Sequence, residues 1–214
     1  EILRCLVGSE MCIRDRGRAM RAASPQLSLT PAGLPAGRRV PRGNMRWYLV
    51  HTPMSMEHAT ADKLLKLIPK NLLADAFTLS KERWEKRNGV WSIRRVQMYP
   101  EYLFVVSSDA HGLNSALQKL SFHVDLVGAT ERSIMPLSED ARAFFERVAG
   151  SERVIRSSTA VILHGELSVT DGPLVGCEAL ITKVDRHKRR CWVRVGEPGR
   201  GFLETLPLDI PIKT

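Results

Sequence analysis

The final third of the chain constrains the fold most, because its apolar residues occur in short strand-like runs without helical periodicity. Such runs, separated by Gly, Pro and charged residues, are typical of a small β-barrel. We therefore predict a β-barrel domain over residues 159–214. Its strand-like runs are Val161–His164, Leu167–Val169, Ala179–Val184, Cys191–Val195 and Phe202–Leu206.

Strand-like and helix-like segments alternate in residues 45–150, which we expect to form a separate domain. Asn88-Gly89 joins two strand-like runs, and this dipeptide strongly favours a tight hairpin turn. Ser138 can cap a helix whose first turn is acidic. The hairpin and the interleaved helices predict an α+β domain with a largely antiparallel sheet. The expected strands are Arg46–His51, Ala76–Arg87, Val90–Met98 and Leu103–Val106, and the expected helices are Ser55–Ile68, Gly112–Phe122 and Ser138–Ala149.

Two segments are predicted to lie outside these domains. Residues 151–158 are polar and interrupt the periodicity, so we expect a linker there. Within residues 1–44, Leu6–Arg16 reads LVGSEMCIRDR, which resembles a translated sequencing-library adapter, and the rest is rich in Pro, Gly, Ala, Arg and Ser. We interpret residues 1–44 as an artefact or a disordered leader, with an Arg-rich organelle transit peptide as the alternative.

The net charge of +9 overstates the basic character of the predicted domains. Residues 1–44 contain eight Arg and three acidic residues, so the rest of the chain has 24 basic and 20 acidic residues, a net charge of +4. This modest positive charge still favours a polyanionic partner. No segment approaches the roughly 20 apolar residues of a membrane-spanning helix. We therefore expect a protein that does not contact the membrane. We also expect it to be cytoplasmic and monomeric.

The side chains that could carry chemistry form no catalytic or metal-binding pattern. The six histidines are scattered, and no base is placed beside a nucleophile. Cys177 and Cys191 lack the spacing of zinc ligands and fit a reducing compartment. Glycine-rich phosphate loops are missing from the sequence. We expect a binding protein rather than an enzyme, with no cofactor and no metal.

Residues 164–176 resemble a KOW motif, in which a Gly-acid strand leads into a Gly-Pro turn and a further glycine. Gly172 and Gly176 are expected at positive φ, and Pro173 is expected to fix the turn between two strands. KOW domains usually have another glycine where this chain has Ala179. The resemblance implies an SH3-like KOW barrel. The residues of the motif's turns are Gly165, Gly172, Pro173 and Gly176.

Residues 45–150 resemble the N-terminal domain of the NusG family of transcription elongation factors. Trp47-Tyr48 lies in the opening strand, and Pro136-Leu137-Ser138 opens the last helix. Between them, Pro100–Val105 stands where the family has Pro-Gly-Tyr and an apolar strand, although Glu101 replaces the glycine. The resemblance implies an antiparallel N-terminal sheet with flanking helices, joined by a linker to the KOW barrel.

The same resemblance implies a contact with RNA polymerase. In the family, the N-terminal domain binds the clamp helices of the polymerase through an aromatic and apolar pocket. Trp47, Tyr99 and Tyr102 fall at pocket positions, and aromatic rings bury much area at little entropic cost. The alternative is that all three belong to the core or to strand edges. For Trp47 the two interpretations carry equal weight, whereas the phenols of Tyr99 and Tyr102 favour the contact.

A cluster of cations between Lys183 and Arg194 distinguishes the chain from a general NusG protein. It resembles the basic loop of LoaP, a specialised NusG paralogue that recognises an RNA hairpin in operon leaders. Clustered Lys and Arg neutralise phosphates and release counterions. The alternatives are a solvated turn that keeps the barrel soluble and a generic ribosome contact. The candidate RNA-binding residues are Lys183, Arg186, His187, Lys188, Arg189 and Arg190.

These resemblances together predict a transcription elongation and antitermination factor. It would bind RNA polymerase through its N-terminal domain and a nascent RNA hairpin through its KOW domain. One alternative is a housekeeping NusG whose KOW domain binds ribosomal protein or Rho. A second is a ribosome-associated KOW protein that makes no polymerase contact.

Overall fold

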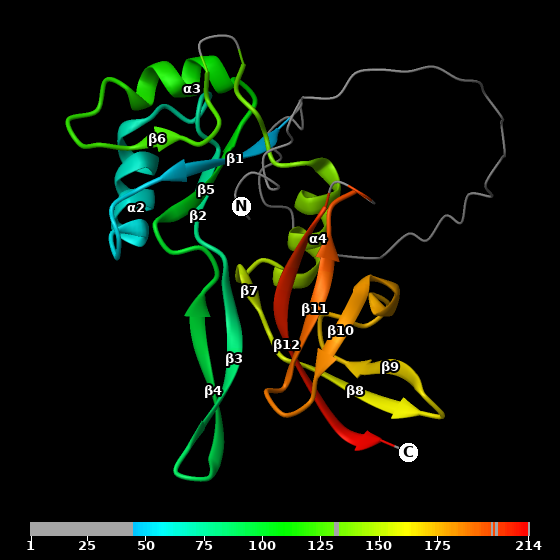
Figure 1. The fold of residues 1–214 in the computed structure, drawn as a ribbon. Coiled ribbons are helices and arrows are strands. Elements are labelled where there is room, and N and C mark those ends of the chain that lie inside the picture. The colour runs from blue at the N-terminus through cyan, green and yellow to red at the C-terminus, as the bar shows by residue number, and fades with distance from the viewer. Residues whose placement is uncertain (1–44, 131–132, 198, 200, 214) are drawn as a thin grey trace, which may run out of the picture.

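The structure, a computed structural model, describes residues 45–130, 133–197, 199 and 201–213. The predicted leader, residues 1–44, lies outside this part of the chain. The described elements confirm an α+β fold (Figure 1). They are β1 (Arg46–His51), α2 (Glu57–Leu67), β2 (Asp75–Phe77), β3 (Ser80–Arg87), β4 (Val90–Gln97), β5 (Tyr102–Ser107), α3 (Ala110–Leu117), β6 (Asp125–Leu126), α4 (Glu139–Ala149), β7 (Val154–Ile155), β8 (Ser158–Leu163), β9 (Glu166–Asp171), the 3-10 turn Glu178–Leu180, β10 (Ile181–Asp185), β11 (Arg190–Val195) and β12 (Phe202–Lys213).

The N-terminal sheet has the strand order β2-β5-β1-β6 and is antiparallel throughout. Successive residues of β1 point to opposite faces. Tyr48 and Val50 belong to a core formed with α2 and α3, whereas Trp47 and Leu49 belong to a second core that includes α4. Because both faces are covered, four consecutive residues of β1 are buried, and the strand reads as an unbroken apolar run.

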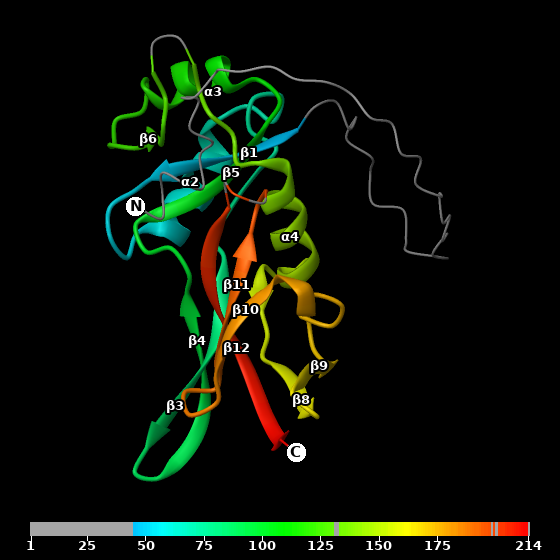
Figure 2. The same ribbon diagram turned by 45° about the vertical axis from the view of Figure 1, so that its right-hand side comes forward.

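The β3–β4 hairpin leaves this sheet and joins β7 in a three-stranded sheet of order β4-β3-β7. Its turn lies at the predicted dipeptide, where Asn88 and Gly89 have φ values of 48° and 82°. The run Ala76–Arg87, which was predicted as one strand, is divided between β2 and β3, and these strands lie in different sheets. Figures 1 and 2 show the hairpin projecting beyond the N-terminal sheet, alongside the C-terminal strands.

The C-terminal sheet has five strands in the order β10-β11-β12-β8-β9 and curls into a half-barrel. Strand β12 pairs antiparallel with β11 over Phe202–Pro207 and parallel with β8 from Leu208 onward. The sequence pattern predicts that this strand ends at Leu206. The structure continues it to Lys213, with an irregular register between Asp209 and Ile212. One long strand therefore holds both halves of the curled sheet.

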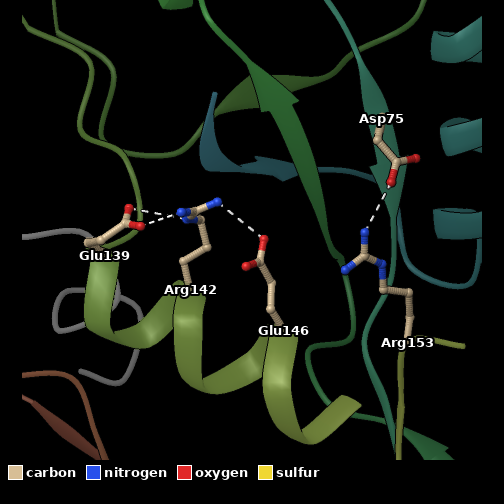
Figure 3. A network of polar contacts seen from close by, with 5 residues as sticks. All are labelled: Asp75, Glu139, Arg142, Glu146 and Arg153. Atoms are coloured by element: carbon tan, nitrogen blue, oxygen red, sulfur yellow. Dashed lines mark hydrogen bonds and ion pairs between the residues drawn. The ribbon is translucent and has the colours of Figure 1, made fainter. Parts of the chain in front are cut away.

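Helix α4 begins at the predicted cap. Ser138 Oγ accepts a hydrogen bond from the amide of Ala141 at 3.4 Å, and acidic residues occupy the first turn, where they complement the helix dipole. Figure 3 shows Arg142 between Glu139 and Glu146, with 3.2 Å between Arg142 Nη1 and Glu146 Oε1. Exposed ion pairs of this kind contribute little to stability. The buried face of α4 therefore dominates its attachment.

One hydrophobic core joins the N-terminal sheet, α4 and the C-terminal sheet. Phe145 of α4 is fully buried. Its ring centroid lies 6.3 Å from that of Phe104 on β5 and 6.4 Å from that of Phe202 on β12. The two parts of the chain therefore share their apolar interior in this structure.

The segment 151–158, predicted as a linker, makes specific contacts with the N-terminal part. It contains β7, which pairs in parallel with the start of β3 and includes the fully buried Ile155. The guanidinium of Arg153 lies 3.9 Å from the centroid of the Phe77 ring and pairs with Asp75 at 3.3 Å (Figure 3). The domain boundaries themselves stay a prediction.

The turn after β9 requires glycine at position 172. Gly172 has a φ of +95°, and an added Cβ would lie 2.7 Å from the Cα of Ser158. Left-handed backbone strain and this steric clash should make Gly172→Ala lower the free energy of unfolding by about 2–3 kcal/mol in a urea titration. Gly165→Ala is the matched control, because Gly165 also has a positive φ but no atom within 4 Å of an added Cβ. Its expected cost is about 1 kcal/mol, and equal losses in both variants would contradict the steric explanation.

Candidate functional site

The six candidate RNA-binding residues lie on β10, β11 and the tight turn of residues 186–189 between them. Asp185 Oδ1 accepts a hydrogen bond from the amide of Lys188 at 3.1 Å. Desolvation acts to raise the pKa of Asp185, but the Lys188 amide and the Arg190 guanidinium outweigh it and hold that pKa below its ordinary value. Asp185 therefore stays ionised and orders the turn. Arg189 has a left-handed backbone conformation, with a φ of 46°, and lies in the turn where the chain reverses direction between β10 and β11.

These six residues divide into an exposed group and a half-buried group. Lys183, Arg186, His187 and Lys188 are exposed, so their side chains can reach a ligand. Together they place three permanent positive charges and one imidazole ring at a single end of the sheet. The exposed group is therefore the stronger candidate for phosphate binding.

Arg189 and Arg190 are held by internal partners. Arg189 Nη1 lies 3.3 Å from the carboxylate of Asp209, and its guanidinium stacks over tryptophan rings of the β3–β4 hairpin. Arg190 Nε lies 3.4 Å from the carboxylate of Asp185, and its guanidinium lies 4.9 Å from the centroid of the Trp192 ring. These two arginines support the turn as well as adding charge to it.

The three candidate polymerase-binding aromatics differ in exposure. Trp47 is 2% exposed and packs edge-on against Phe77 and Phe104, so it is part of the core in this arrangement. Tyr99 is 9% exposed and also packs against Phe104. Tyr102 is half-buried at the start of β5. Tyr102 is therefore the most accessible of the three, and Trp47 the least.

Glu204 of β12 links the C-terminal sheet to Tyr99 and to β3. The Tyr99 hydroxyl donates to Glu204 Oε2 at 2.8 Å, and Lys81 Nζ donates to Glu204 Oε1 at 2.8 Å and to the Thr205 carbonyl at 2.6 Å. Burial and the neighbouring carboxylate raise the pKa of Tyr99 well above its ordinary value. The Tyr99 hydroxyl therefore stays protonated and can donate to Glu204.

The alternating pattern of β12 already indicates that Glu204 faces the core. Phe202, Glu204, Leu206 and Leu208 alternate along β12, and all four are buried. An acid in the core-facing register of a strand needs a buried partner. Sequence periodicity could identify such an acid, but only the structure identifies Lys81 and Tyr99 as its partners.

The turn before β5 keeps a left-handed residue although the expected glycine is absent. Glu101 has a φ of 69°, and its amide donates to Glu57 Oε1 at 2.7 Å. Glu57 is itself buried at the start of α2. Desolvation acts to raise the pKa of Glu57, but the Glu101 amide and other backbone donors leave it lowered. A charged Glu57 therefore offsets part of the strain at Glu101.

No reactive thiol or metal cluster accompanies these residues in the described part of the chain. Cys177 and Cys191 are free and buried. Burial raises the pKa of Cys191 to about 12, so its thiolate does not form near neutral pH. The described residues contain no group of three or more His, Cys, Asp or Glu side chains that could hold a metal ion. Each helix among them is too short or too polar to cross a membrane.

Comparison with known proteins supports the relationship suggested by the N-terminal motifs. Residues 45–145 match the family model NusG, described as "Transcription termination factor nusG". The match ends inside α4, before the C-terminal sheet. A solved structure titled "Domain interaction in Thermotoga maritima NusG" is 19% identical, has a TM-score of 0.45, and covers 76% of this chain and 93% of that chain. No curated protein sequence matches the chain.

Proposed function

We propose that the chain, whose residues 45–145 match the NusG family model, is a non-enzymatic transcription factor of the LoaP-like antitermination type. Its C-terminal sheet would act as a KOW domain that binds a hairpin of nascent leader RNA. Its N-terminal part would bind the clamp helices of RNA polymerase and keep the elongation complex resistant to pausing. Binding of the RNA would then recruit the factor to particular operons.

The observation that carries the RNA-binding proposal is the exposed cationic group at the β10–β11 turn. Lys183, Arg186 and Lys188 are exposed within a short stretch whose acid, Asp185, is already used to order the turn. Cations concentrated in this way bind phosphates and release counterions. A structured RNA is a fitting ligand, because double-stranded RNA is recognised mainly by its shape and its backbone.

The match of residues 45–145 to the NusG family model supports binding to RNA polymerase, and we propose that Tyr102 and Tyr99 take part in it. The Tyr102 side chain is half-buried, so part of it is accessible to a protein partner in this structure. Tyr99 is covered by β12 and bonded to Glu204. A polymerase contact through Tyr99 would therefore require β12 to separate from it.

The RNA-binding proposal is tested by removing two exposed cations from the turn. In the full chain, Arg186→Ala with Lys188→Ala should lower the affinity for a structured RNA hairpin about tenfold and reduce the slope of log affinity against log salt by about one to two. Fluorescence anisotropy at several salt concentrations measures both quantities. Arg189 and Arg190 are left intact because their removal would break ion pairs with Asp209 and Asp185, whereas Arg186 loses only a 3.5 Å contact with the Ile210 carbonyl.

Lys66→Ala with Lys70→Ala is the matched control. It removes the same charge at exposed positions in and after α2, and it should change the affinity less than twofold. If the turn variant binds no more weakly than this control, the RNA-binding proposal is wrong. The C-terminal sheet would then face a protein partner, as in a housekeeping NusG that binds ribosomal protein or Rho, or in a ribosome-associated KOW protein.

A further inference from the structure

We infer that the β3–β4 hairpin and the β10–β11 turn form one RNA-binding surface, in which Trp91 stacks on an unpaired base while the turn binds phosphates. The inference rests on the proposed RNA-binding function and extends it to the N-terminal part of the chain. It also assigns a role to the projecting hairpin, which neither the KOW motif nor the predicted polymerase contact uses.

Arg189 joins the hairpin to the turn. Its guanidinium carbon lies 4.6 Å from the ring centroid of Trp84 and 4.8 Å from that of Trp91, while its Nη1 lies 3.3 Å from Asp209 Oδ2. Trp84 Nε1 also donates to Ser157 Oγ at 2.9 Å, which holds the hairpin against the start of β8. Figures 1 and 2 both show the β10–β11 turn beside the hairpin. The two elements are therefore in direct contact through Arg189.

The hairpin face that meets Arg189 combines aromatic rings with apolar and cationic groups. Lys86 pairs with Trp91 and Trp84 pairs with Ile93, so these four side chains share one face of the hairpin. Lys86 Nζ lies 5.9 Å from the centroid of the Trp91 ring. Ile93 is 46% exposed and Trp91 is half-buried, which leaves part of this face open to a ligand.

The hairpin also carries more positive than negative charge. Residues Lys81–Gln97 contain six cations and two acids. On the face opposite Trp91, Glu85 pairs with Arg83, with Arg87 at 3.7 Å and with Arg94 at 4.0 Å. Three arginines around one carboxylate leave a net positive charge there as well. A polyanion therefore complements the hairpin together with the exposed cations of the turn.

Aromatic rings beside a cationic groove are the combination that binds unpaired nucleic acid, because every base has a π-face that can stack. An RNA hairpin offers paired phosphates to the turn and unpaired flanking or loop bases to Trp91. The experiment uses the full chain and two probes, an RNA hairpin with a single-stranded uridine tail and the same hairpin without the tail. Affinity is measured by fluorescence anisotropy, and stacking by quenching of tryptophan fluorescence.

Trp91→Ala should weaken binding of the tailed hairpin about tenfold, while Trp91→Phe should recover most of that loss because it keeps a ring. Binding of the blunt hairpin should change less than twofold in both variants. Lys86→Ala should weaken binding of both probes more than Arg87→Ala, since Lys86 lies beside Trp91 and Arg87 lies on the opposite face. Tryptophan quenching on addition of the tailed hairpin should be smaller in Trp91→Ala than in the unchanged chain.

The outcomes separate this inference from the proposed function. If Arg186→Ala with Lys188→Ala weakens RNA binding but Trp91→Ala behaves like Arg87→Ala, the hairpin is not part of the surface and the proposed function stands. If the unchanged chain binds neither probe more tightly than it binds heparin, the proposed function and this inference are both wrong. Loss of binding confined to the tailed probe in Trp91→Ala supports the composite surface.

Discussion

Phe145→Ala is expected to lower the free energy of unfolding by about 3–5 kcal/mol, the range typical of a deleted core aromatic ring. Phe145 is fully buried and its ring contacts Tyr99, Phe104, Phe144 and Phe202. These neighbours come from the N-terminal part, from α4 and from β12, so the lost ring would leave a cavity where the two parts meet. Urea denaturation followed by circular dichroism measures the loss.

Phe122→Ala is the matched control for this prediction. Phe122 is a half-buried phenylalanine that packs at the edge of the other core. Its loss should cost about 1–2 kcal/mol, because less area returns to water and the site can relax. A loss below about 1 kcal/mol for Phe145→Ala would mean that the two sheets do not share a core in solution.

Glu204→Ala is expected to lower the free energy of unfolding by about 2–4 kcal/mol, because it leaves the Lys81 ammonium and the Tyr99 hydroxyl without their partner. This expected loss of stability is smaller than that for a fully buried ion pair, because the side chains of Lys81 and Glu204 are 17% and 11% exposed. The same change removes polar contacts between β12 and the N-terminal part. We therefore expect the urea transition to broaden or to divide into two steps.

Glu166→Ala controls for the removal of an acid from the C-terminal sheet. Glu166 is exposed at the start of β9, so its substitution should change stability by no more than about 0.5 kcal/mol. Glu204→Gln should retain part of the stability, because its amide oxygen can still accept the Tyr99 hydroxyl. If Glu204→Ala is no more destabilising than Glu166→Ala, the contacts of Glu204 do not hold the two parts together.

Local sequence rules predicted the elements whose geometry depends on neighbouring residues. Asn88-Gly89 adopts positive φ values at the hairpin turn, and Ser138 caps α4. Helix α3 shows the limit of such rules. It begins two residues before the predicted Gly112, because Asp109 accepts a hydrogen bond from the Gly112 amide, and it ends at Leu117 rather than Phe122.

Long-range pairing decided two strands that the local sequence pattern does not show in full. Strand β12 continues through Pro207 and Pro211 because β8 becomes its partner after β11 ends. The segment 151–158 is polar in sequence, yet Val154 and Ile155 are buried because β3 offers an open edge. Neither partner could be inferred from the residues next to these segments in the chain.

The α+β class, the hairpin, the helix cap, the strand-rich C-terminal part and the cationic turn all follow from the amino-acid sequence. Each of these depends on periodicity, turn chemistry or local charge, which act over a few residues. Three other features depend on tertiary packing: Trp47 enters the core, Glu204 contacts Tyr99 and Lys81, and Arg189 lies over the tryptophans of the hairpin. These contacts join residues as many as 123 positions apart, and local patterns contain no information about which distant segments the packing brings together.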